Sequence, residues 1–105
     1  MDNIEKRIEV ISEMEEILNK HNDIISTLQD AVEEFKNHQE EYDKLSEYYS
    51  SEEYFKDLEL DQNGEFPENL SRGVLTEDAV FDLFGDNFNM AVEMLEIATE
   101  ILKNH

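Results

Sequence analysis

The sequence contains no cysteine and no tryptophan, one proline and three glycines. Without cysteine the chain forms no disulfide and offers no thiolate as a nucleophile or metal ligand, which suits a reducing compartment. Between residues 3 and 49 neither proline nor glycine occurs, so the two strongest helix breakers are missing from nearly half of the chain. These absences predict long helices.

Basic residues are also scarce. Eight Lys and Arg stand against 28 Asp and Glu, which gives a formal net charge of -20 at pH 7. Such a surface repels phosphate backbones and anionic lipids, so we expect no direct binding of nucleic acid. The hydrophobic content of 39% is too high for a disordered acidic chain, and 105 residues suit one folded domain.

Long apolar runs are absent as well. No stretch approaches the roughly 18 consecutive apolar residues that span a bilayer, so we expect no membrane insertion. The first ten residues, MDNIEKRIEV, lack the basic head and apolar core of a secretory signal. We therefore expect a cytoplasmic protein.

Apolar side chains recur every seven residues along the first half of the chain, which is typical of a coiled coil or helical bundle. The stripe contains Ile4, Ile11, Leu18, Ile25 and Val32 in one series, Arg7, Met14, His21, Leu28, Phe35, Tyr42 and Tyr49 in a second, and Val10, Ile17, Ile24 and Ala31 in a third. A stripe of this width suits a helix that faces two neighbours.

Residues 19–23, NKHND, are poor helix formers, and a chain reversal there would give a three-helix bundle. The seven-residue register nevertheless continues across them, which a turn would have no reason to preserve. We predict one long helix over residues 3–49, about 70 Å long at about 1.5 Å per residue.

The sequence SSEE at residues 50–53 fits a capping box in which Ser50 reaches forward and Glu53 reaches back. We expect a short helix over residues 51–60 that buries Tyr54, Phe55 and Leu58. Residues 61–75 hold the only proline and two of the three glycines, and this composition predicts an ordered loop.

Thr76 is the expected N-cap of a C-terminal helix over residues 77–103, whose apolar positions again follow three-and-four spacing. The predicted fold is all-α, a helical hairpin or bundle: a long N-terminal helix packed antiparallel with the C-terminal helix, with the short helix and loop between them. A C-terminal helix of about 40 Å would leave roughly 30 Å of the long stripe uncovered. We therefore predict a homodimer, or docking of a protein partner whose identity the sequence does not give.

Residues 59–70 resemble a calcium loop in part. With Glu59 as its first position, Asp61, Asn63 and Gly64 fall on ligand or turn positions, but the twelfth position is Leu70, which has no oxygen ligand to offer. The alternative is an Asn-Gly turn that needs no metal.

Chemistry-bearing patterns are few. Glu34 and His38 do not have the Glu-x-x-His spacing of a di-iron helical bundle, and no nucleophile elbow or glycine-rich phosphate loop occurs. We predict no enzyme, with no catalytic residues, no cofactor and no metal ligands.

Arg72 is the only arginine after position 7, and acidic residues flank it on both sides. Its planar guanidinium can pair with two carboxylates at once. We interpret it as a brace that ties the loop to the short helix and to the first turn of the C-terminal helix. The alternative is a contact with an anion or a protein partner.

The segment from Tyr48 to Val80 carries a family pattern: YYSSEEY at residues 48–54, Lys56-Asp57, Asp61, Gly64, PENL at residues 67–70 and RGVLTEDAV at residues 72–80. It resembles a domain-of-unknown-function family of small acidic helical proteins of Gram-positive bacteria, which includes the bacteriocin-like-peptide fitness protein BlpT. The resemblance identifies as motif or brace residues Tyr48, Tyr49, Ser50, Asp57, Asp61, Gly64, Pro67, Leu70, Arg72, Gly73, Val74, Leu75, Glu77 and Asp78.

The resemblance implies an accessory protein, in some members linked to bacteriocin fitness, without an established activity. The hypothesis is therefore a non-enzymatic interaction or accessory protein, associated with fitness or immunity. The alternatives are an acidic decoy that mimics nucleic acid toward a basic protein, and the calcium-binding loop.

Overall fold

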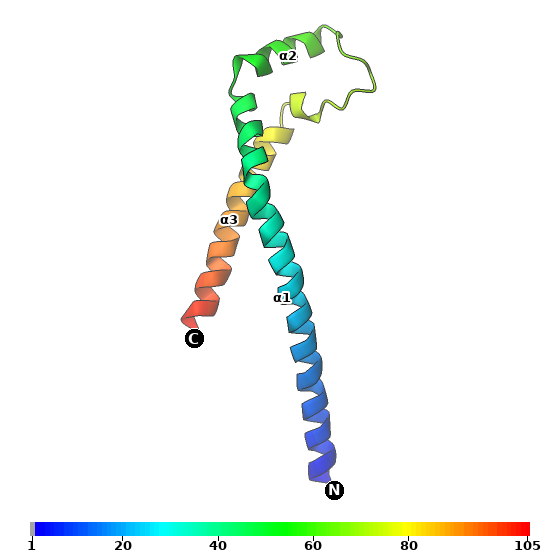
Figure 1. The fold of residues 1–105 in the computed structure, drawn as a ribbon, viewed down its shortest axis with the longest axis vertical. Coiled ribbons are helices and arrows are strands. Elements are labelled where there is room, and N and C mark those ends of the chain that lie inside the picture. Colours follow the sequence, from blue (N-terminus) through cyan, green and yellow to red (C-terminus); the bar gives the residue numbers. More distant parts are fainter. Residues whose placement is uncertain (1) are drawn as a thin grey trace. The chain divides into compact units, whose positions relative to one another are not determined.

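The computed structural model describes residues 2–105 and is helical almost throughout (Figure 1). It contains α1 (Asp2–Tyr49), α2 (Glu52–Gln62), the 3-10 helix η1 (Gly73–Leu75) and α3 (Ala79–Lys103). No strand occurs in this range. The predicted order of a long N-terminal helix, a short helix and a C-terminal helix is confirmed, whereas the antiparallel packing of the outer two stays a prediction.

Helix α1 continues without interruption through residues 19–23, so the prediction of one long helix is correct and the chain reversal does not occur. The weak helix propensity of NKHND costs only a few tenths of a kcal/mol per residue, and the helical turns on both sides outweigh it. Asp2 and Glu5 lie in the first turn, where their charges stabilise the positive end of the helix dipole.

The chain divides into two compact units, which meet between Lys44 and Leu45. The first consists of the α1 residues up to Lys44. The second contains the last turn of α1 together with α2, η1 and α3. The core lies in the second unit, where Tyr54 of α2, Leu75 of η1 and Val80 of α3 are buried.

Helix α2 begins one residue later than predicted because Ser51, not Ser50, is its N-cap. The Ser51 Oγ accepts a hydrogen bond from the Tyr54 backbone N–H at 3.3 Å. The Ser50 backbone N–H donates to the Glu47 carbonyl oxygen at 3.3 Å, so Ser50 still belongs to the last turn of α1. At its other end α2 continues to Gln62, two residues past the predicted end.

The predicted burial of Phe55 is wrong. Tyr54 takes the inward position of α2, and the next residue lies about 100° further around a helix with 3.6 residues per turn. The Phe55 side chain is consequently 64% exposed. Leu58, one turn on from Tyr54, is half-buried.

Thr76 does not cap α3, which begins at Ala79 instead of the predicted residue 77. Its Oγ1 donates to the Gly73 carbonyl oxygen at 2.6 Å, and its backbone N–H donates to the same oxygen at 3.1 Å. Both bonds make Thr76 the end of η1. Because Thr76 is the C-cap of η1, α3 begins three residues later, at Ala79.

The small core makes Leu75 a sensitive position. We expect Leu75→Ala to lower the free energy of unfolding by about 2 to 4 kcal/mol, because truncation removes buried methyl groups and leaves a cavity. Leu70→Ala is the matched control, since Leu70 is 46% exposed in the same loop and its truncation should cost about 0.5 kcal/mol or less. Urea titration followed by circular dichroism measures both, and equal losses would contradict this core.

Candidate interaction surfaces

Four aromatic side chains meet where α1 ends, and together they form what we term the aromatic joint. The Tyr49 ring lies 4.9 Å from the Tyr54 ring and 5.4 Å from the Phe84 ring of α3. The Tyr48 ring meets Tyr54 edge to face at 5.7 Å and 89°. Such tilted and edge-to-face pairs are favoured by the aromatic quadrupole. The joint fixes the last turn of α1 to α2 and to the start of α3.

Polar contacts at the same place stabilise the turn between α1 and α2. The Tyr48 hydroxyl donates to Asp57 Oδ2 at 2.6 Å, and the Ser51 hydroxyl donates to the Tyr48 carbonyl oxygen at 2.6 Å. The hydrogen bond to Asp57, with burial and the negative charge of Asp57 adding to it, raises the pKa of Tyr48 to about 12. Sequence reasoning named Tyr48 and Asp57 separately and missed their pairing.

Arg72 pairs with α2. Its Nη1 donates to Asp61 Oδ1 at 2.6 Å, and the two side chains are 35% and 23% exposed. The pair joins the loop just before η1 to the last turn of α2. Glu77 and Asp78, which we expected near Arg72, are exposed ahead of α3.

This pairing also bears on the calcium hypothesis. Residues 59–62 are the last turn of α2, and the Asp61 carboxylate already accepts from Arg72. A calcium loop needs these oxygens on irregular backbone that wraps around the ion. Residues 59–62 are helical, so the first positions of the expected calcium loop do not have the irregular backbone that such a loop requires.

The remaining motif residues build the connection between α2 and α3. Gly64 has a φ of 72°, a left-handed conformation that favours glycine, and Pro67 accepts a hydrogen bond from the Leu70 N–H at 3.1 Å. Gly73, Val74 and Leu75 form η1, in which only Leu75 is buried. Ser50, Gly64, Pro67 and Leu70 are exposed residues and are not part of the core.

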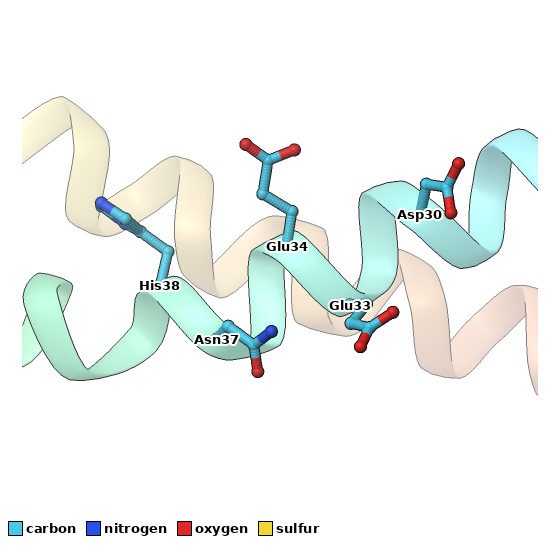
Figure 2. Close-up of a pocket in the computed structure, with 5 residues that line it drawn as sticks. All are labelled: Asp30, Glu33, Glu34, Asn37 and His38. Carbon is cyan, nitrogen blue, oxygen red and sulfur yellow. The ribbon is translucent and has the colours of Figure 1, made fainter.

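A shallow hollow on α1 is lined by Asp30, Glu33, Glu34, Asn37 and His38 (Figure 2). The five side chains come from consecutive turns of one helix. In the view of Figure 2 the side chains of Glu34 and His38 point upward and those of Glu33 and Asn37 point downward, so the five side chains do not converge on a common point. Within residues 2–105 no group of three or more His, Asp or Glu side chains could hold a metal ion.

The apolar stripe of α1 is the largest candidate surface in the first unit. No α1 residue is buried. We define the α1 stripe as the ten large aliphatic side chains that are 43% to 66% exposed, namely Ile4, Ile8, Ile11, Met14, Ile17, Leu18, Ile24, Ile25, Leu28 and Val32. None of the helices in the described part of the chain is apolar enough over a sufficient length to cross a membrane.

Comparison with known proteins identifies a family whose description names no biochemical activity. The model of the family described as Domain of unknown function (DUF4298) matches residues 11–97, a range that contains most of the α1 stripe and the whole aromatic joint. No curated protein and no solved structure matches the chain.

The raised pKa of Tyr48 gives a pH test. Because the neutral phenol is the favoured form in the folded chain, its stabilisation is complete below pH 10.0 and is lost as the pH rises to about 12. We expect Tyr48→Phe to lower the free energy of unfolding by about 1 to 2 kcal/mol near neutral pH. The difference between the two proteins should shrink across that window in urea titrations, and a constant difference would contradict the assignment.

The Arg72–Asp61 pair is partly exposed, so its expected contribution is modest. Arg72→Ala should lower the free energy of unfolding by about 1 kcal/mol or less, as for other solvent-accessible ion pairs. Lys56→Ala is the control, because Lys56 is an exposed base on α2, the helix that carries Asp61. A double-mutant cycle with Asp61→Asn isolates the pair, and a coupling energy of zero would show that the two side chains are merely neighbours.

Proposed function

The chain belongs to the family described as Domain of unknown function (DUF4298), and from its exposed surfaces we propose that it is a non-enzymatic protein-interaction protein. The observation that carries the proposal is the α1 stripe, ten large aliphatic side chains on a helix that buries none of its residues. Soluble monomers rarely expose contiguous apolar surface on this scale.

The proposed occupant of the α1 stripe is a second copy of the chain. Burying a large aliphatic side chain completely stabilises by about 1.5 to 3 kcal/mol, and these side chains are roughly half exposed. Two copies that cover each other's ten side chains would gain on the order of 20 kcal/mol. Association costs about 4 to 15 kcal/mol, so the apolar gain is large enough to offset it, while charge repulsion between the two acidic chains opposes pairing.

The wider role rests on the sequence pattern of residues 48–80. Its resemblance to a family that includes a bacteriocin-like-peptide fitness protein supports an accessory role, associated with fitness or immunity, in the cytoplasm of a Gram-positive bacterium. In this proposal the dimer is the working form, and the chain acts by binding protein and not by catalysis.

A second candidate function is an acidic decoy, which the net charge of -20 favours. A decoy would bind a basic nucleic-acid-binding protein through its carboxylates, and salt would abolish that binding. Association through the α1 stripe would persist at high salt, because apolar burial is not screened. Salt dependence therefore separates the two candidates.

The α1 stripe makes a direct prediction about oligomeric state. We expect sedimentation equilibrium to show a dimer at micromolar concentration for the wild type, and Ile11→Gln/Ile25→Gln to weaken dimerisation at least about a hundredfold, equivalent to about 2.7 kcal/mol. Far-UV circular dichroism should show helicity that increases with concentration in the wild type, because most helical stability in proteins comes from packing of the apolar face.

The matched control is Ser12→Gln/Ser26→Gln, which places the same side chain on the neighbouring positions of the same helix. This variant should dimerise like the wild type. The proposal would be contradicted by a wild type that is monomeric and whose helicity does not change with concentration. Equal weakening of dimerisation by both double variants would also contradict it.

A further inference from the structure

Helix α3 carries an apolar ladder of its own. Phe81, Phe88, Leu95 and Leu102 follow one another at seven-residue intervals and are 67%, 68%, 68% and 73% exposed. These are the four highest values among the large hydrophobic side chains of the described chain. A seven-residue repeat keeps side chains on one face of a helix, so the four form a continuous strip, which we term the α3 ladder.

Gly85 lies beside this ladder in the interior of α3, four residues after Phe81 and three before Phe88. A residue three or four positions away is a neighbour on the helix surface, so Gly85 leaves a notch flanked by the two phenylalanines. A Cβ added at Gly85 would meet nothing within 4 Å, and its φ is not in the left-handed region. Nothing within the chain requires glycine there, although glycine weakens a helix. Close approach of another backbone would require it.

The acidic side chains of α3 all lie on one flank of the ladder. With 3.6 residues per turn, Asp82, Asp86, Glu93, Glu96 and Glu100 fall within about 60° to 140° of Phe81 in the same rotational sense. All five are exposed. The only basic residue of α3 is Lys103, its last residue. An occupant of the ladder would therefore place one of its own flanks against a row of carboxylates.

We infer that the α3 ladder, with the Gly85 notch at one end and the acidic row along its side, docks a cationic amphipathic helix of another protein. The charge pattern selects this occupant, because basic side chains on one flank of an apolar helix would face the carboxylates while its apolar side chains pack on the ladder. A second copy of this chain fits poorly, since it has eight basic residues against 28 acidic ones. This surface is separate from the α1 stripe and does not depend on the proposed dimer.

The test uses the full chain and two synthetic helical peptides. One has leucine at the first and fourth positions of each heptad and lysine at the exposed positions, and the other has glutamate in place of every lysine. Calorimetry at about 150 mM salt, where exposed charges are largely screened beyond about 8 Å, should show saturable binding of the lysine peptide and none of the glutamate peptide. Absence of binding by the lysine peptide overturns the inference.

Three variants separate docking on the ladder from nonspecific attraction of the lysine peptide to an acidic protein. Leu95→Ser should weaken binding of the lysine peptide at least about tenfold, whereas Ile97→Ser, an exposed position elsewhere on α3, should change it less than about threefold. Gly85→Ala should raise the melting temperature of the protein and yet weaken binding, because the methyl group fills the notch. Equal losses in the serine pair, or a Gly85→Ala variant that binds like the wild type, would overturn the inference.

The dimerisation variant Ile11→Gln/Ile25→Gln distinguishes this inference from the proposed function. It should bind the lysine peptide like the wild type even where it no longer dimerises. Loss of peptide binding in that variant would place the peptide on the α1 stripe, which overturns the inference about α3 while leaving the α1 stripe as an interaction surface.

Discussion

A single amphipathic helix cannot cover its own apolar side, and this constraint governs the first unit of the chain. Residues 2–44 of α1 have no other element of their own unit to pack against, so the ten side chains of the α1 stripe keep about half of their surface exposed. Helix propensity alone does not hold such a segment in water, because most helical stability in proteins comes from packing of the apolar face. Folding of α1 and binding of a partner to the α1 stripe are therefore thermodynamically coupled. Helix α1 should be most helical when a partner covers the stripe.

In the second unit the chain changes direction between successive elements, and the contacts there fix where each helix begins and ends. Its core is three residues from three elements, too few to specify the path by burial alone. Polar groups with defined directions supply the rest: Ser51 serves as acceptor for the start of α2 and as donor to the end of α1, and the Arg72–Asp61 pair fixes where the loop returns. The residues that carry the family resemblance are concentrated here. Several of them, including Tyr48, Asp57, Asp61 and Arg72, make the hydrogen bonds that set the path of the backbone.

How far the sequence alone could predict this structure depends on whether a feature is local or tertiary. The unbroken α1 was predictable because a seven-residue register is a property of the segment itself, and one register extends across residues 19–23. The starts of α2 and α3 were missed by one and two residues because neighbouring hydroxyl groups compete for the same role: Ser51 and not Ser50 caps α2, and Thr76 closes η1. The exposure of Phe55 and the pairing of Tyr48 with Asp57 depend on which side of α2 faces the joint, and no local pattern in the sequence specifies that side.

The charge of the chain acts in opposite directions on its two apolar surfaces. Two copies that meet through α1 bring together two chains of formal charge -20, so screening by salt reduces their repulsion and strengthens the pairing. On α3 the carboxylates beside the ladder attract a cationic helix, and screening weakens that attraction. The acidic surface thus opposes the proposed self-association through α1 and favours the proposed cationic partner at α3. If both proposals hold, a chain of this composition gains selectivity from its charge at the cost of some stability in its dimer, because the same carboxylates that repel a second copy attract a cationic helix.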